Sequence, residues 1–395
     1  MRLLFSQAGP SAAFDIEENA YVDSNDDRKM LGRYRKYCDE LRLLLRSGEK
    51  IYTKAEALAN FFPFPKDLGY IVPFPNIYKP RKNLFNLKLR MEARNIIEEE
   101  VRNADRVIVR TCGFWPNPVV IDMCRKYGKL YMIEAVEFPF AMRWYSNNPL
   151  SKLRAPYAEM RTRTEIARAP YVAYVTQSVL QQRYPTSGKS LGCSDVELPE
   201  LDPQILETRI NTYGGGGNRV IFGTAANIGS LKGQAYVVRA LAELKRQGIT
   251  NIEYHLAGVI TTPKFQALVN SLNLQDQVKL FGPIPHGKIF DWYDTLDVYI
   301  HPSFTEGLCR SIVEAMSRAL PVTCSDAGGN PELASGDMLF KAGNVGQICG
   351  AIKRMLDPEV RKSEAMRSFA LAKSFQKSRL DPIRDKFYMD FINGI

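Results

Sequence analysis

Two glutamates eight residues apart, Glu306 and Glu314, follow the end of an apolar segment that predicts a strand over 297–301. A helix with an apolar stripe at helical spacing is expected to open near Gly307. The first amides of a helix are unpaired donors, and the helix dipole also favours an anion there. Carboxylates at both sides of such a site could hold hydroxyl groups at either end of a diphosphate-linked ligand. The alternative is that Glu306 caps the helix and Glu314 pairs with Arg310 on a solvated face.

The elements around this segment alternate regularly from residue 219 onward. Apolar strands are expected at 219–223, 252–258, 278–281, 297–301, 321–324 and 338–340. Helices are expected between and after them at 232–247, 263–273, 286–295, 307–319 and 344–356. This alternation predicts an α/β fold with a parallel sheet that is covered on both faces and binds ligands at the carboxyl ends of its strands.

The first half of the chain has a less regular pattern, and the length of 395 residues favours two domains. Strands are expected at 3–6, 105–110, 130–138 and 171–177, and helices at 82–103 and 152–168. We expect two α/β domains that face a central cleft. Their expected bounds are 1–195 for the first domain, 196–218 for a linker closed by Gly214 to Gly217, 219–358 for the second, and 359–395 for helices that cross back to the first.

The ordered series of motifs in the second half resembles one protein family. Glu306-GLCRSIV-Glu314 matches the E-x7-E signature of the group 1 (family four) retaining glycosyltransferases of the GT-B fold, whose domains are two Rossmann-like units. The resemblance is good over roughly 219–345 and weak before residue 170. The flanking motifs that also match are Gly282 to Pro285, Asp297, His301-Pro302-Ser303, Gly328-Gly329-x-Pro331-Glu332 and Lys232-Gly233.

The resemblance implies a role for each matching residue. Glu306 would hold hydroxyls of the donor sugar, and Glu314 would hold the ribose diol. The backbone near Ile284 would meet the base. The diphosphate would be cradled by Lys232 and the amides of Gly307, Leu308, Cys309 and Arg310. These cations and amides would stabilise the departing nucleotide diphosphate without a metal or other cofactor, and a UDP-sugar is the favoured donor.

Some positions depart from the family pattern. The family usually has an Arg shortly before the Lys, where this chain has Ala226 or Asn227, and Arg310 could compensate. Cys309 stands where Pro or Gly is common, and we interpret it as a small apolar filler. The family often supplies a histidine from the first domain, whereas residues 1–195 contain none.

Three residues of the first domain remain candidates for the site. Gly9 follows the first expected strand and could let the backbone approach the diphosphate. Glu134 and Glu137 stand at a strand end, where they could meet the acceptor or could simply pair with arginines. Retention of anomeric configuration has two routes, and Glu137 would be the nucleophile of the covalent one. The resemblance favours the other route, in which the acceptor attacks on the face that the phosphate leaves.

Charge is concentrated in the first half of the chain. The total is +10, of which +9 falls in residues 1–195, and this favours an anionic partner. The segment 77–94 combines basic and apolar residues and could lie on an anionic membrane or pack against its own domain. The aromatic residues do not interleave with the basic run as a nucleic-acid surface requires. Seven cysteines without a CxxC pair indicate reduced thiols in a cytoplasmic protein, and no apolar run is long enough to span a bilayer. If the segment 77–94 binds lipid, the protein would lie peripherally on the inner face of the membrane.

The function expected from the sequence is polysaccharide biosynthesis. A hexose or N-acetylhexosamine would pass from a nucleotide sugar to a polysaccharide or lipid-linked glycan acceptor. Two alternatives remain open at this point. One is a nucleotide-sugar epimerase or hydrolase, which would turn over without an acceptor, and the other is a non-catalytic partner subunit, which would not bind the donor.

Overall fold

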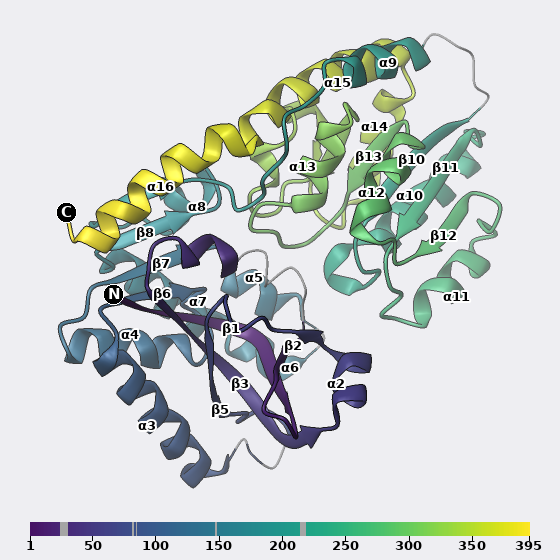
Figure 1. Ribbon diagram of the computed structural model, residues 1–395. Coiled ribbons are helices and arrows are strands. Elements are labelled where there is room, and N and C mark those ends of the chain that lie inside the picture. The colour runs from purple at the N-terminus through teal and green to yellow at the C-terminus, as the bar shows by residue number, and fades with distance from the viewer. Residues whose placement is uncertain (24–30, 81–82, 84, 147, 214–218) are drawn as a thin grey trace.

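The chain forms two α/β lobes that are bridged by long helices near the carboxyl terminus (Figure 1). This computed structural model describes residues 1–23, 31–80, 83, 85–146, 148–213 and 219–395. Each lobe contains a largely parallel sheet with helices on both faces, so the expected α/β class is confirmed. Among the described residues, no helix is both long and apolar enough to cross a bilayer.

The sheet of the amino-terminal lobe has more strands than the sequence predicts. Its parallel strands lie in the order β5 (Tyr70–Pro75), β3 (Glu40–Tyr52), β1 (Arg2–Asp15), β6 (Arg106–Arg110), β7 (Tyr131–Ala135), β8 (Tyr171–Tyr174) and β9 (Lys189–Gly192). Two short antiparallel strands extend it: β2 (Ala20–Val22) pairs with β1, and β4 (Phe62–Pro63) pairs with β2. Strands β3 and β5 were not expected, and β1 is longer than the predicted strand.

Both faces of this sheet are buried because alternate side chains enter two different cores. Leu4 joins one core with Ile97 of helix α3, while Leu3 and Phe5 join the other with Phe391 of helix α16. A strand that is buried on both faces has an apolar run rather than a polar–apolar alternation. The helices of this lobe are α2 (Lys54–Asn60), α3 (Leu87–Asn103), α4 (Asn117–Lys126), α5 (Pro139–Trp144), α6 (Pro149–Leu153), α7 (Ala155–Ala167) and α8 (Val179–Arg183).

The sheet of the carboxyl-terminal lobe follows the sequence prediction closely. Its strands lie in the order β12 (Val278–Gly282), β11 (Ile252–Ala257), β10 (Val220–Ala225), β13 (Val298–His301), β14 (Val322–Ser325) and β15 (Leu339–Phe340). Each lies within two residues of its predicted bounds. The helices are α10 (Gln234–Arg246), α11 (Lys264–Ser271), α12 (His286–Asp294), α13 (Arg310–Ser317) and α14 (Val345–Met355).

The strand order creates a reversal point between β10 and β13. The chain proceeds outward from β10 through β11 to β12, then returns to the other side of β10 to form β13. In an open parallel sheet, ligands bind at the carboxyl ends of the two strands that flank such a point. The loops after β10 and β13 carry Lys232 and Glu306, respectively.

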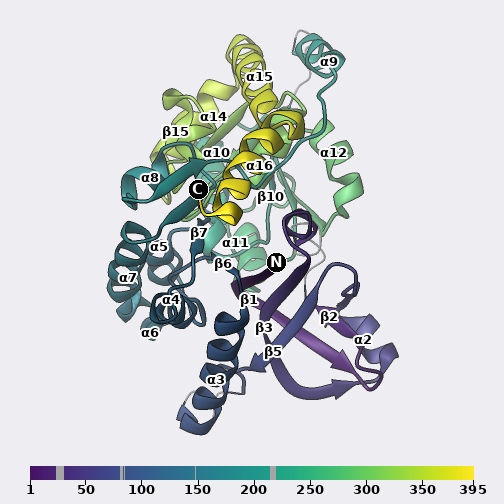
Figure 2. The same cartoon turned by 60° about the vertical axis from the view of Figure 1, so that its left-hand side comes forward.

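The connections between the lobes contain more helix than the sequence predicts. Helix α9 (Gln204–Thr212) lies within the expected linker, whereas the predicted turn at Gly214 to Gly217 lies outside the described residues. Helix α15 (Pro358–Ala372) packs on the carboxyl-terminal lobe, and α16 (Lys377–Asn393) continues onto the amino-terminal lobe (Figures 1 and 2).

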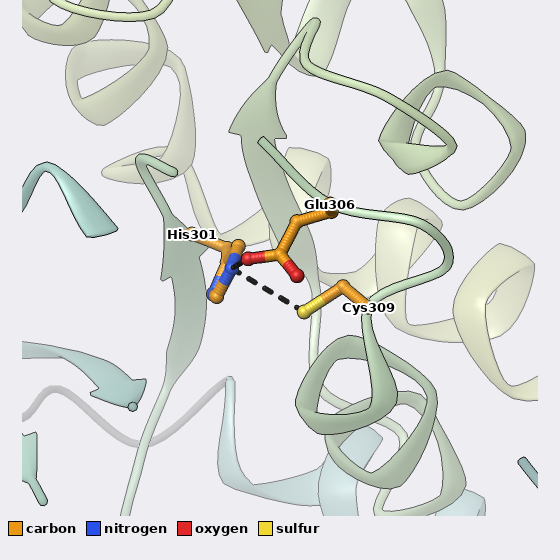
Figure 3. A group of neighbouring side chains, drawn as sticks. All are labelled: His301, Glu306 and Cys309. Atoms are coloured by element: carbon orange, nitrogen blue, oxygen red, sulfur yellow. Dashed lines mark hydrogen bonds and ion pairs between the residues drawn. The ribbon is translucent and has the colours of Figure 1, made fainter. Parts of the chain in front are cut away.

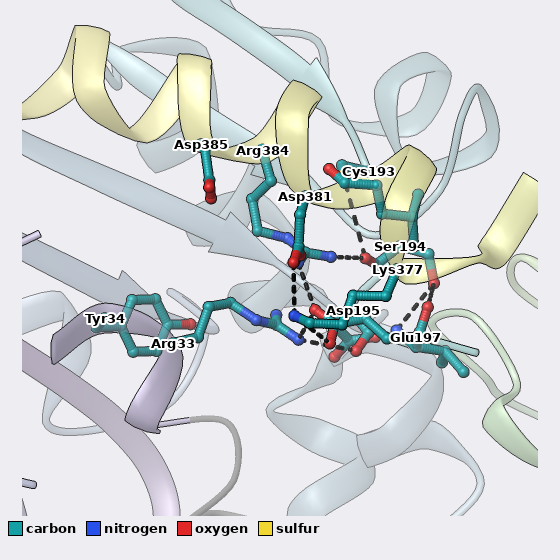
Figure 4. Close-up of polar contacts among 12 residues, drawn as sticks. Arg33, Tyr34, Cys193, Ser194, Asp195, Glu197, Lys377, Asp381, Arg384 and Asp385 are labelled. Carbon is teal, nitrogen blue, oxygen red and sulfur yellow. Dashed lines mark hydrogen bonds and ion pairs between the residues drawn. The ribbon is translucent and has the colours of Figure 1, made fainter. Parts of the chain in front are cut away.

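Ion pairs hold α16 to the segment that leaves β9 (Figure 4). Glu197 pairs with Arg384 and also with Arg33, 2.8 Å away. The Nη2 atom of Arg384 donates to the backbone oxygen of Ser194 over 2.7 Å. Arg384 is almost fully buried and also pairs with Asp381 at 3.0 Å, so removing Glu197 would leave a buried charge with one carboxylate partner fewer.

Candidate active site

Three charged or titratable side chains meet at the reversal point of the carboxyl-terminal sheet. The Nζ atom of Lys232 lies 2.6 Å from the Oε1 atom of Glu306. The Nε2 atom of His301, at the end of β13, lies 2.8 Å from the same oxygen (Figure 3). The structure therefore brings Lys232 and Glu306 together across the two loops.

The loop that carries Lys232 is held against the loop after β13 by a glycine. Gly233 has a φ angle of +71°, and a Cβ atom there would overlap with the backbone oxygen of Pro302. The backbone oxygen of Leu231 accepts hydrogen bonds from the amide of Phe304 at 2.9 Å and from the hydroxyl of Ser303 at 3.2 Å. These contacts fix the distance between Lys232 and the loop that presents Glu306.

The Gly328-Gly329 motif supports the other side of the Glu306 loop. Gly328 has a φ angle of +58°, and a Cβ atom there would overlap with the backbone oxygen of Glu306. The amide of Gly329 donates to the backbone oxygen of Gly307 over 2.9 Å. The glycines are needed because the backbone following β14 passes directly over this loop.

Glu306 is ionised and His301 is protonated over a wide pH range. Burial opposes the charge on Glu306, but His301 and Lys232 lower its pKa to about 2. Burial likewise opposes the charge on His301, but Cys309 and Glu306 raise its pKa to about 9. Burial also opposes the charge on Lys232, and Glu306 more than offsets it, so the pKa of that ammonium is raised. One carboxylate thus lies between two cations.

Cys309 completes this cluster. Its Sγ atom lies 3.3 Å from the Nε2 atom of His301 and 3.4 Å from the hydroxyl of Ser311, and its side chain is buried. His301, Glu306 and Cys309 offer ligand atoms within 4.8 Å of one another, a nitrogen–oxygen–sulfur set that suits zinc. The ammonium of Lys232 contacts the same carboxylate, however, and it already supplies the positive charge that a metal would bring.

Glu314 lies further along α13 in a different environment. The hydroxyl of Tyr293 donates to its Oε2 atom over 3.1 Å, and the Nε2 atom of His286 lies 3.4 Å from its Oε1 atom. Burial raises the pKa of Glu314, although His286 and Tyr293 act in the opposite direction. His286 begins α12, two residues after Ile284, so the expected base-side loop and the expected ribose carboxylate are neighbours.

The start of α13 differs from the prediction. The helix begins at Arg310 with Cys309 as its cap, so Gly307 and Leu308 precede it. The unpaired amides of the first turn therefore belong to residues 310–312, whereas the prediction placed them at 307–310. The helix starts later because the Gly307 backbone is engaged by Gly329. Arg310 is exposed at the first helical position, and its charge helps to lower the pKa of Asp195.

The amino-terminal lobe contacts the site directly at Gly307. A Cβ atom on Gly307 would overlap with the backbone oxygen of Val136, which follows β7. A second contact lies nearby, where the carboxylate of Glu332 accepts hydrogen bonds from the amides of residues 177–179 at the start of α8, over distances of 2.7–2.9 Å. The two lobes are therefore closed against each other beside Glu306.

Glu137 lies at this junction, next to Val136. Burial raises its pKa to about 7, although the charge of Arg110 acts in the opposite direction. A carboxyl group with this pKa exchanges a proton near neutral pH. Glu137 is the acidic residue of the amino-terminal lobe whose position fits the predicted acceptor side.

Glu134 does not fit the prediction that it meets the acceptor. It is only 3% exposed, and its carboxylate accepts hydrogen bonds from Arg110 and Tyr34, each at 2.7 Å, and from Tyr388 of α16. Because side chains alternate along β7, Glu134 lies on the same face as Met132, toward the core that contains Tyr34 and Tyr388. Its contacts join α16 to the amino-terminal lobe, which is a structural role.

Gly9 also lies in a different setting from the predicted one. It was expected in a loop after a short strand, but β1 continues to Asp15 and Gly9 lies at an irregularity between Ser6 and Ser11. Its φ angle of +129° is one that side chains rarely allow. Its backbone oxygen accepts a hydrogen bond from Arg46.

His301, His286 and Tyr293 had no predicted role. His301 was part of a quoted motif, and its proximity to Glu306 only five residues later was the available signal. The contacts of Glu314 with His286 and Tyr293 depend on the packing of α12 against α13, which sequence spacing does not reveal. Asn227 stands at the place of the missing Arg. Its Oδ1 atom accepts a hydrogen bond from the amide of Val259 over 3.3 Å, and its backbone oxygen accepts one from the side chain of Gln234 over 3.2 Å.

The two Rossmann-like lobes, with charged residues at the reversal point of the second, define a GT-B glycosyltransferase fold. Residues 210–372 match the family model described as glycosyl transferases group 1. Protein CapJ of Staphylococcus aureus is 27% identical over 99% of this chain and 96% of its own length.

Two further relatives illustrate local sequence similarity and overall structural similarity. The phosphatidylinositol N-acetylglucosaminyltransferase GPI3 subunit of Saccharomyces cerevisiae is 36% identical over 23% of this chain and 21% of its own length. The structure of Anabaena HepE in complex with UDP and glucose superposes with a TM-score of 0.65 at 16% identity and covers 100% of both chains.

Proposed function

We propose that the protein is a retaining, metal-independent transferase that moves a hexose or N-acetylhexosamine from a nucleotide-diphosphate sugar, favouring UDP, to a polysaccharide or lipid-linked glycan. The observation that carries this proposal is the contact between Lys232 and Glu306 at the reversal point of the sheet. The complex of HepE with UDP and glucose supports the choice of donor, and the GPI3 subunit supports a lipid-linked acceptor.

In this proposal the donor lies across the start of α13. Its sugar hydroxyls hydrogen-bond to Glu306 and its ribose diol to Glu314, while the base lies near Ile284. The diphosphate lies between Lys232 and the free amides of residues 310–312. A cation and oriented amides stabilise the negative charge that grows on the leaving diphosphate, and this stabilisation needs no metal ion.

Retention is best explained by attack on the face that the diphosphate leaves. The acceptor oxygen forms a bond to the anomeric carbon as the carbon–phosphate-oxygen bond breaks, and the leaving phosphate oxygen takes the acceptor proton. Glu137 lies at the junction of the lobes and is the candidate for the covalent alternative. A Glu137→Ala variant that keeps most of its transfer rate supports front-face attack, and complete loss with rescue by azide supports the covalent route.

The proposal also includes peripheral binding to an anionic membrane. At the start of α3, Phe85, Leu87 and Met91 are 65–89% exposed, so they do not pack against their own domain. Arg81, Lys82 and Leu84 of the predicted segment lie outside the described residues. Apolar side chains next to Lys88 and Arg90 fit the interface of an anionic bilayer. Loss of cosedimentation with anionic vesicles in a Phe85→Ser/Leu87→Ser variant would support this surface.

The test of the proposed function is a panel of nucleotide sugars in a thermal-shift assay, followed by incubation of the best donor with glycan acceptors. A ligand at 100 times its dissociation constant stabilises the folded state by about 2.7 kcal/mol. Acceptor-dependent turnover supports a retaining transferase if the product keeps the anomeric configuration of the donor. Acceptor-independent turnover would instead indicate an epimerase or hydrolase, and the absence of any donor binding a non-catalytic subunit.

A further inference from the structure

Two arginines of the amino-terminal lobe have no carboxylate partner. Arg143 lies in α5, and Arg154 lies between α6 and α7. Within the described parts of the chain, neither guanidinium has an acidic oxygen within ion-pair distance, and the Nε atom of Arg143 is buried without a hydrogen-bond acceptor. By contrast, Arg161 and Arg163 of α7 pair with Asp122 and Glu159, at 2.8 and 3.1 Å.

The surroundings of Arg143 make its charge energetically unfavourable unless an anion is bound. Its guanidinium lies 4.6 Å from the centre of the Phe114 ring, which covers one face of the group. Burial, together with the charge of Arg154, lowers the pKa of Arg143. Two neighbouring cations with unused donors favour a ligand with several anionic oxygens, and a phosphate fits a guanidinium with paired hydrogen bonds.

The arginines are close to the junction of the lobes. Arg143 is near enough to Glu137 for each charge to affect the other's pKa. Glu137 follows Val136, whose backbone contacts Gly307 beside Glu306. A phosphate held at Arg143 would therefore lie on the acceptor side of the candidate active site.

An apolar surface adjoins the two arginines. Helices α5, α6 and α7 lie together on one side of the amino-terminal lobe (Figure 2). Their large exposed apolar side chains are 47–77% accessible and comprise Trp144, Leu150, Leu153, Tyr157 and Met160. A ligand that combined a phosphate with a hydrocarbon chain could contact both the arginines and this surface.

We propose that Arg143 and Arg154 bind the phosphate of an amphipathic acceptor whose hydrocarbon part lies over the exposed apolar side chains of α5, α6 and α7. This inference rests on the proposed transferase function and specifies the chemistry of its acceptor. Lipid-linked glycans and membrane phospholipids share a phosphate next to hydrocarbon, so the test must separate the two sources.

The first measurement uses decyl phosphate, below its micelle concentration, as a probe with the proposed chemistry. Trp144 follows Arg143 in α5, and Trp115 follows Phe114, whose ring lies against Arg143, so the fluorescence of these two tryptophans reports binding. We expect saturable binding that Arg143→Met and Arg154→Met each weaken about tenfold, since a charge-assisted hydrogen bond contributes about 1.5–3 kcal/mol. Arg143→Lys should retain part of the affinity, and the control Arg163→Met all of it.

Matched probes separate the contribution of the phosphate to binding from that of the hydrocarbon tail. Decyl maltoside, which has the tail without the phosphate, should bind without sensitivity to Arg143→Met, and glycerol 3-phosphate should bind more weakly than decyl phosphate. Unchanged affinity in both methionine variants, or an equal loss in Arg163→Met, would overturn the proposal. This assay needs no donor, so its outcome is independent of whether the protein transfers a sugar.

Vesicle cosedimentation and steady-state kinetics together show whether the arginines bind the acceptor or a membrane lipid. For an acceptor site, Arg143→Lys and Arg154→Met raise the KM for a phosphate-bearing amphipathic acceptor, whereas the KM for the donor and cosedimentation with phosphatidylglycerol vesicles stay unchanged. If these variants instead lose vesicle binding while decyl phosphate affinity and the acceptor KM are unchanged, the arginines contact a membrane headgroup and the acceptor proposal is wrong.

Discussion

The ammonium of Lys232 lies 2.6 Å from the carboxylate of Glu306, although the two residues belong to loops that follow different strands. The contact forms because β10 and β13 are adjacent in the sheet and Gly233 lets the first loop touch Pro302. This pairing places a positive charge at the point where the proposed diphosphate must leave.

Removing the Lys232 charge tests this arrangement. We expect Lys232→Ala to lower kcat/KM about 100-fold or more, because the loss of one electrostatic contact to developing charge costs about 3 kcal/mol of transition-state stabilisation. The measurement is steady-state kinetics with varied donor. Lys353→Ala, on the exposed side of α14, serves as the control and should behave like wild type. Equal activity in the two variants would exclude Lys232 from the site.

The stability of the protein should depend on pH through His301. Its pKa is raised to about 9 in the folded protein from an ordinary value of 6.5. The folded state therefore holds this proton more tightly, and the resulting stabilisation, on the order of 3 kcal/mol, is complete below pH 6.5 and is lost as the pH rises to 9. Urea unfolding of wild type and His301→Gln should give a stability difference that shrinks over this range. A difference that is constant with pH would contradict the assignment.

The contact between Gly307 and Val136 predicts that a methyl group at position 307 separates the lobes. Gly307→Ala should lower kcat/KM at least about tenfold and open the molecule in small-angle scattering, since backbone and Cβ cannot share the same space. Gly287→Ala is the matched control, because a Cβ atom there meets nothing within 4 Å. On α12 this change should leave activity intact and raise stability by up to about 1 kcal/mol.

Glu137 offers a second test of burial at the junction. Its pKa of about 7 lies above the ordinary value of 4.5, so the folded state binds a proton that the unfolded state releases. The stabilisation that comes from the neutral form of Glu137 is therefore lost as the pH rises from 4.5 to 7. Glu137→Gln should therefore raise the free energy of unfolding more at pH 8 than at pH 5. An equal effect at both pH values would show that Glu137 is not desolvated.

Metal removal separates the proposed mechanism from a metal-assisted one. Transfer activity should be unchanged in EDTA, because Lys232 and the amides of residues 310–312 supply the positive charge. Added zinc should inhibit through His301 and Cys309, and Cys309→Ser should relieve that inhibition. Loss of activity in EDTA, with recovery on adding Mg²⁺ or Mn²⁺, would contradict metal independence.

The sequence predicted the carboxyl-terminal lobe well because each strand there is a short apolar run between amphipathic helices. It predicted the amino-terminal lobe less well: β3 was missed although Leu41, Leu43 and Leu44 are fully buried. That strand continues into polar residues, and only its pairing with β1 and β5 defines it.

The candidate site was likewise predicted only in part. Motif spacing identified Glu306, Glu314 and Lys232, which the structure places on neighbouring loops and a helix. Spacing could not reveal that Glu134 points inward to Arg110, or that Val136 meets Gly307. Both depend on side-chain direction or on the docking of two lobes, and neither is encoded in a local pattern.

The most direct test of the central claim is a calorimetric titration of wild type, Lys232→Ala and Glu306→Gln with a panel of UDP- and GDP-sugars. We expect saturable binding of at least one nucleotide sugar to wild type, weakened about tenfold or more in each variant. Binding that both substitutions leave unchanged, or no binding of any nucleotide sugar to wild type, would contradict it.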